Sequence, residues 1–133
     1  MRALLAKWSP GLYPARFTGN STILQETTIE QLTPFQVKDK LTNQPEFKLL
    51  DVREPFEYDL AQIDGSLLVT QEVVDEILQN WEKDTPIICC CHHGMRSQQA
   101  CQSLASQGFT RLYNLSGGID AWSVEIDPGV PRY

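Results

Sequence analysis

The sequence predicts one α/β domain, in which a central parallel sheet of about five strands lies between layers of helices on both faces. Short apolar segments typical of buried strands alternate along the chain with segments whose apolar residues recur at helical spacing. This alternation is typical of a parallel sheet covered by helices on its two faces. The length of 133 residues fits a single domain.

We expect three parts along the chain. Residues 1–27 contain proline and glycine at short intervals, which predicts an irregular N-terminal extension. Residues 28–125 are expected to form the domain, and residues 126–133 a C-terminal tail.

The first half of the domain is expected to begin with a strand at 28–32. Thr33 is then placed to cap a helix that has Pro34 at its first position and extends to Leu41. Residues 47–52 are apolar almost throughout, as expected for a parallel strand covered on both faces. After them we expect a helical turn at 54–60, a tight turn at 63–65 and an extended segment at 66–69.

The second half begins with residues 72–81, whose apolar side chains recur at helical spacing. Residues 86–90 are predicted to form the central strand. A helix is expected at 97–107, closed by Gly108 in a left-handed conformation. A strand at 110–115 and a last helix at 119–124 complete the prediction.

Composition excludes several classes of function. The net charge of −6 argues against a general nucleic-acid surface, which would need a basic stripe. No apolar run approaches the roughly 20 residues that span a bilayer, and the N-terminal apolar stretch is too short for a secretory signal. We therefore expect a cytoplasmic protein that binds neither nucleic acid nor membrane.

The segment that follows the expected strand 86–90 has the pattern of a nucleophile. Cys91 ends the strand, Gly94 allows a sharp turn, and a helix follows. Unpaired N–H groups at a helix start carry about half a positive charge, which favours a thiolate. In parallel sheets, ligands bind beyond the carboxyl ends of strands. Arg96 offers a guanidinium fork suited to a sulfonate, and His92 and His93 add anion-binding capacity.

Four segments resemble the single-domain rhodaneses, the thiosulfate sulfurtransferases, and they occur in that family's order. They are Cys91–Ser97, Leu49–Tyr58, Gln107–Phe109 and Leu115–Trp122. The match covers residues 28–125, although Gln62–Ser66 departs from the family's usual His-Ile-Pro-Gly-Ala.

The resemblance implies a three-layer rhodanese-like domain with Cys91 as the nucleophile that carries a persulfide. The rest of the active-site loop would bind substrate: His92, His93, Gly94, Met95 and Arg96. Asp51, Arg53 and Ser97 would support this loop. The implied reaction moves sulfane sulfur from thiosulfate or another small donor to cyanide or a thiol, in two half-reactions. No cofactor or metal is expected.

Three alternatives stay open at this point. A sulfur carrier could relay the persulfide between proteins, such as a desulfurase and a thioredoxin-like partner, with the same motif. A phosphatase or arsenate reductase is disfavoured, because four residues rather than five separate Cys91 from Arg96. A zinc site on residues 89–93 is disfavoured too, because consecutive strand residues point apart and structural zinc sites use spaced pairs.

Overall fold

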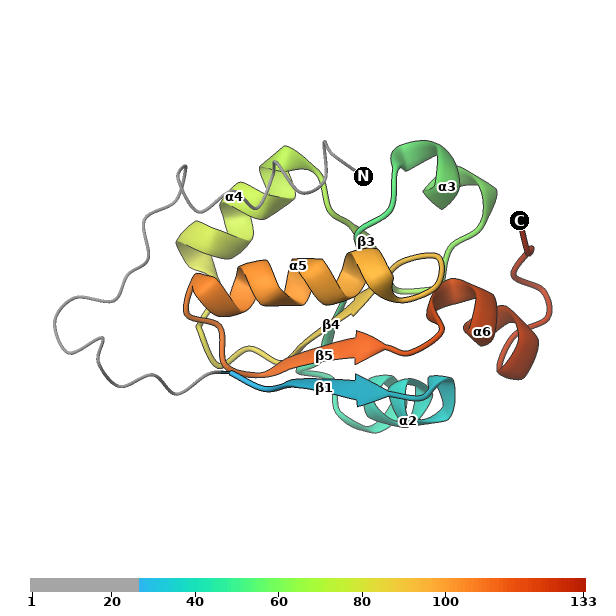
Figure 1. Cartoon of the computed structure of the whole chain (residues 1–133), viewed down its shortest axis with the longest axis horizontal. Helices are drawn as coiled ribbons and strands as arrows, with labels where there is room; N and C mark the ends of the chain where they lie inside the picture. The colour runs from blue at the N-terminus through green and yellow to red at the C-terminus, as the bar shows by residue number, and fades with distance from the viewer. Residues whose placement is uncertain (1–26) are drawn as a thin grey trace, which may run out of the picture.

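A computed structural model describes residues 27–133 of the chain. They form a five-stranded parallel sheet in the order β1-β5-β4-β2-β3 (Figure 1). The strands are β1 (Ile29–Leu32), β2 (Lys48–Asp51), β3 (Leu67–Leu68), β4 (Ile87–Cys90) and β5 (Leu112–Leu115). The helices are α2 (Pro34–Asn43), α3 (Pro55–Leu60), α4 (Gln71–Asn80), α5 (Met95–Ser106) and α6 (Gly118–Glu125). The predicted fold class is confirmed.

Two buried clusters hold the layers together, one on each face of the sheet. Apolar residues of α4 and α5 pack on one face with Leu50 and Cys89. Apolar residues of α2 and α6 pack on the other face with Leu49 and Cys90. Neighbouring strand residues therefore face opposite clusters, and all four residues of β4 are buried. This is the arrangement of a central parallel strand.

The start of α2 confirms the predicted cap. The Thr33 side chain accepts a hydrogen bond from the Gln36 amide (3.2 Å), and the Gln36 side chain accepts one from the Thr33 amide (2.9 Å). Pro34 occupies the first turn. This reciprocal pair satisfies two donors that would otherwise be unpaired at the helix start.

The predicted boundary was wrong at the helix after Cys91. Ser97 was expected to open it, but α5 begins at Met95. Gly94 precedes it with a φ of +105°, a left-handed conformation open to glycine at little cost, so the chain turns into the helix two residues earlier. Gly108 does take the predicted left-handed conformation, with a φ of +99°.

The expected C-terminal tail folds back over the domain. Val130 is buried, and its carbonyl accepts a hydrogen bond from the Ser123 hydroxyl. The expected N-terminal extension lies outside the described residues, apart from residue 27. Within residues 27–133, no helix combines the length and the apolar character that crossing a membrane requires.

Candidate active site

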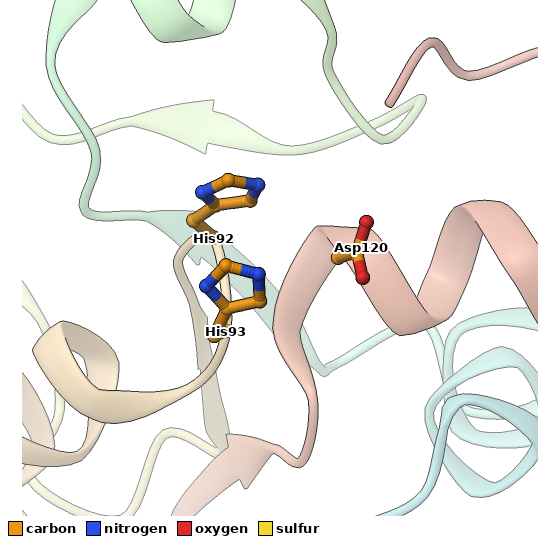
Figure 2. A group of neighbouring side chains, drawn as sticks. All are labelled: His92, His93 and Asp120. Carbon is orange, nitrogen blue, oxygen red and sulfur yellow. The ribbon is translucent and has the colours of Figure 1, made fainter. Parts of the chain in front are cut away.

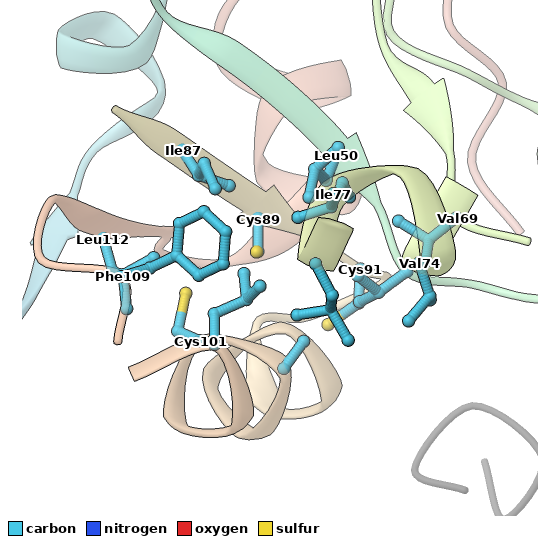
Figure 3. Close-up of a cluster of buried hydrophobic side chains, with 14 residues drawn as sticks. Leu50, Val69, Val74, Ile77, Ile87, Cys89, Cys91, Cys101, Phe109 and Leu112 are labelled. Atoms are coloured by element: carbon cyan, nitrogen blue, oxygen red, sulfur yellow. The ribbon is translucent and has the colours of Figure 1, made fainter. Parts of the chain in front are cut away.

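The Cys91 sulfur lies at the start of α5 and accepts hydrogen bonds from the loop. The amide N–H groups of Gly94 and Ser97 donate to it at 3.0 and 3.3 Å. The residue is only 1% exposed and belongs to the cluster under α4 and α5 (Figure 3). A buried sulfur that receives two main-chain donors is placed to carry negative charge.

A chain of polar contacts extends from this sulfur to the edge of the sheet. The Ser97 hydroxyl lies 3.3 Å from the sulfur and donates to Asn114 Oδ1 at 2.5 Å. The Asn114 amide donates to the Gly94 carbonyl (3.0 Å) and to the side chain of Gln31 (2.8 Å). Asn114 thus contacts both Gly94 and Ser97, the two residues whose amides donate to the Cys91 sulfur.

Helix α6 supports the same loop from the other side. The Ile119 amide donates to the Cys91 carbonyl (2.8 Å), and the Asp120 amide donates to the His92 carbonyl (3.2 Å). A Cβ atom on Gly118 would lie 2.5 Å from the Cys91 carbonyl oxygen, and the φ of Gly118 is +64°. Glycine is therefore required for this close approach.

Arg96 is paired with a carboxylate that the sequence analysis did not identify as a site residue. Its two terminal nitrogens donate to Glu57 at 2.7 and 2.8 Å. The hydrogen bond from Arg96 lowers the pKa of Glu57 from 4.5 to about 2, against the opposing effect of burial. The Glu54 amide and the Tyr133 hydroxyl also donate to Glu57. The charge of Arg96 is thus compensated within the protein.

Asp51 and Arg53 form a fully buried pair at the end of β2. Arg53 donates to Asp51 at 2.6 and 2.9 Å, and to the carbonyls of Glu57 and Ala61. Burial opposes the charged guanidinium, but the hydrogen bonds to Asp51 and Tyr133 outweigh it and raise the pKa of Arg53. The pair holds the segment 57–61, and with it the partner of Arg96.

The two loop histidines gather at the start of α6. Their rings stack at 3.9 Å, and the Tyr133 ring stacks on the other side of His92 at 4.0 Å. Burial lowers the pKa of His92. Asp120 lies beside both histidines (Figure 2), and these three side chains are close enough to hold a metal ion. Met95, by contrast, is 77% exposed and points to solvent.

The remaining cysteines lie deeper in the core. The hydrogen bond with Cys101 and burial raise the pKa of Cys89, and burial raises that of Cys90. The Cys101 thiol donates to the Tyr113 carbonyl (3.3 Å). A thiol whose pKa is raised is a poor nucleophile. The Cys91 sulfur accepts hydrogen bonds from the main-chain amides of Gly94 and Ser97.

The structure thus brings Cys91, Gly94 and Ser97 together and keeps Arg96 beside them in an ion pair. Sequence reasoning missed the supporting roles of Glu57, Asn114 and Tyr133. Glu57 lies inside a motif quoted for the resemblance, but nothing local indicates its partner. A groove of about 500 Å³ borders the loop and is lined mainly by amide side chains: Gln31, Gln98, Gln99, Gln102 and Asn114, with Gly94 and Met95.

Comparison with known proteins gives consistent matches. Residues 33–125 match the family described as rhodanese-like domain. Thiosulfate sulfurtransferase GlpE of Glaesserella parasuis is 30% identical over 97 residues, which cover 73% of this chain and 89% of that protein. The solution structure of the rhodanese-like domain of an Anabaena protein is 28% identical and superposes with a TM-score of 0.65, covering 78% of each chain.

A longer relative matches over one part of its length. The probable adenylyltransferase/sulfurtransferase MoeZ of Mycobacterium tuberculosis is 32% identical over 104 residues, or 77% of this chain. The chain spans about a quarter (26%) of that protein.

Proposed function

The chain belongs to the rhodanese-like domain family, and from this premise we propose that it is a thiosulfate sulfurtransferase whose Cys91 carries the transferred sulfur. The observation that carries the proposal is the pair of amide donors, from Gly94 and Ser97, on the Cys91 sulfur. These donors stabilise negative charge on a thiolate or on the terminal sulfur of a persulfide.

The reaction has two half-reactions. The Cys91 thiolate attacks the outer sulfur of thiosulfate, and the S–S bond of the donor breaks with its electron pair leaving on sulfite. Cyanide or a thiolate then attacks the outer sulfur of the Cys91 persulfide. Thiocyanate or a new persulfide leaves, and the Cys91 thiolate is regenerated.

The loop residues divide the remaining roles in this proposal. The amides near Gly94 stabilise the sulfur anion, while Arg96 uses the N–H donors that Glu57 does not occupy to bind the sulfonate end of thiosulfate. Asp51, Arg53 and Ser97 hold the loop in place. Because Cys91 is only 1% exposed, the site favours a small anion over a bulky donor.

A protein acceptor is the second candidate. MoeZ is named as both adenylyltransferase and sulfurtransferase, which supports a role for a domain of this kind in passing sulfur between proteins. The amide-lined groove beside Gly94 and Met95 offers surface for such a partner. In this version, persulfide formation at Cys91 is unchanged and only the acceptor differs.

Intact mass spectrometry tests the proposal. After incubation with thiosulfate, the wild-type chain is expected to gain the mass of one sulfur atom, mapped to Cys91, and to release it as thiocyanate on addition of cyanide. Cys91→Ser should do neither. Cys101→Ala, which removes a buried thiol on α5, should do both. An equal rate of thiocyanate formation in Cys91→Ser and the wild type would overturn the assignment.

A further inference from the structure

We propose that His92, His93 and Asp120 form a binding site for a divalent transition-metal ion, with Zn²⁺ as the best fit. This site goes beyond the proposed sulfur transfer, which uses no metal. One ligand atom from each residue lies within 4.8 Å of the other two. Figure 2 shows the two imidazoles on the loop and the carboxylate at the start of α6 facing the same space.

The donor set suits zinc. Two imidazole nitrogens and one carboxylate oxygen leave a fourth tetrahedral position open to water or a ligand. Bonds of about 2.0–2.1 Å place neighbouring ligand atoms about 3.4 Å apart. The ligand atoms lie within 4.8 Å of one another, so the largest separation exceeds this spacing by up to about 1.4 Å. The exposed His93 side chain can close the difference by rotating.

The main chain holds the cluster together before any ion binds. The Asp120 amide donates to the His92 carbonyl (3.2 Å), and Gly118 lets α6 approach the loop closely. Asp120 therefore stays beside His92. The rings of His92 and His93 stack at 3.9 Å with an interplanar angle of 26°. Stacking leaves the nitrogen lone pairs free, because these lie in the ring planes.

His92 carries the observation that points to a ligand. Its Nε2 atom is buried and has no hydrogen-bond partner among residues 27–133. Buried polar atoms are usually paired, and an ion at this position would satisfy the nitrogen. The Tyr133 ring stacks on the imidazole at 4.0 Å, with an interplanar angle of 7°, and holds its orientation.

Arg132 would compete with a metal ion for the Asp120 carboxylate. Arg132 donates to both carboxylate oxygens of Asp120, at 2.8 and 3.2 Å. The Arg132 side chain is 62% exposed, so salt and solvent screen this ion pair. A metal ion must compete with Arg132 for the Asp120 carboxylate, so removing Arg132 should strengthen metal binding.

Titration calorimetry of the chelator-treated full chain with Zn²⁺ tests the site. The wild type is expected to bind one ion. His93→Gln and Asp120→Asn should each weaken the affinity by about tenfold or more, whereas Arg132→Ala should strengthen it. Asp64→Asn, which changes an exposed carboxylate outside the cluster, in the turn before β3, should have no effect. No binding, or equal affinity in the first two variants and the wild type, would overturn the proposal.

Cobalt spectroscopy distinguishes this site from metal capture by the nucleophile. Co²⁺ is expected to give d–d bands without an intense sulfur-to-cobalt charge-transfer band, and Cys91→Ser should leave the spectrum unchanged. A charge-transfer band that disappears in Cys91→Ser would place the ion on the thiol and contradict the site. Because the readout is metal binding, this outcome is independent of whether Cys91 transfers sulfur.

Discussion

Arg96 and Glu57 form a two-point ion pair across 39 residues of sequence, with N–O distances of 2.7 and 2.8 Å. Arg96 lies in the first turn of α5, directly after the loop that begins at Cys91, and Glu57 belongs to α3. The pair ties the loop to α3. It also leaves part of the guanidinium free, since Arg carries five N–H donors.

Removal of Arg96 should impair the use of an anionic donor. Arg96→Ala is expected to raise the KM for thiosulfate by about tenfold, the loss of one charge-assisted hydrogen bond. The double variant Arg96→Ala/Glu57→Gln should recover part of this loss, because it removes the carboxylate left uncompensated beside the site. Steady-state thiocyanate formation gives both values. Equal loss with thiosulfate and with a neutral persulfide donor would contradict an anion-binding role.

Stability should fall at low pH because of Glu57. Its pKa is about 2 in the folded protein against an ordinary 4.5, so the folded state binds this proton less tightly than the unfolded state. The stabilisation is fully present above pH 4.5 and is lost as the pH falls to 2. Between pH 5 and 2, urea unfolding should show the wild type losing about 3 kcal/mol more than Glu57→Gln. Parallel losses in the two proteins would contradict this account.

Two glycines with left-handed conformations allow a matched test of the loop support. Gly118→Ala would place a Cβ 2.5 Å from the Cys91 carbonyl oxygen, whereas Gly65, with a φ of +84°, has open space around it. Gly65→Ala should cost only about 1–2 kcal/mol of unfolding free energy, for the backbone conformation. Gly118→Ala should cost more and should also reduce sulfur transfer, because the loop carbonyls must move. Similar effects of the two substitutions on transfer would argue against the close contact.

The buried pair of Asp51 and Arg53 should behave as a unit. Arg53→Met leaves Asp51 buried without its partner and is expected to cost about 3–5 kcal/mol of unfolding free energy. Adding Asp51→Asn should restore part of that stability, because no unpaired charge then remains in the core. Chemical denaturation of the single and double variants measures the coupling. Strictly additive effects would show that the two side chains act independently.

The sequence by itself determined the fold class and the position of the thiol that we propose as the nucleophile, because both depend on local patterns. Alternating strand and helix periodicity predicts a parallel sheet, and Cys91 follows the most continuously apolar strand and precedes a glycine. The cap of α2 at Thr33 could also be predicted from the sequence, because it depends on Thr33 and the proline that follows it. The first residue of α5 could not be predicted, because the choice between Met95 and Ser97 depends on the backbone conformation at Gly94.

Only the tertiary structure decided how the site is supported. Asn114 reaches the loop from β5, Gly118 from α6 and Glu57 from α3, and Tyr133 returns from the C-terminal tail to contact both Glu57 and Arg53. These contacts join residues 17 to 80 positions apart. A side chain's distant partner depends on how the layers dock, which no short sequence pattern encodes. Local chemistry therefore identifies the thiol, and packing of the sheet and helices selects the groups that surround it.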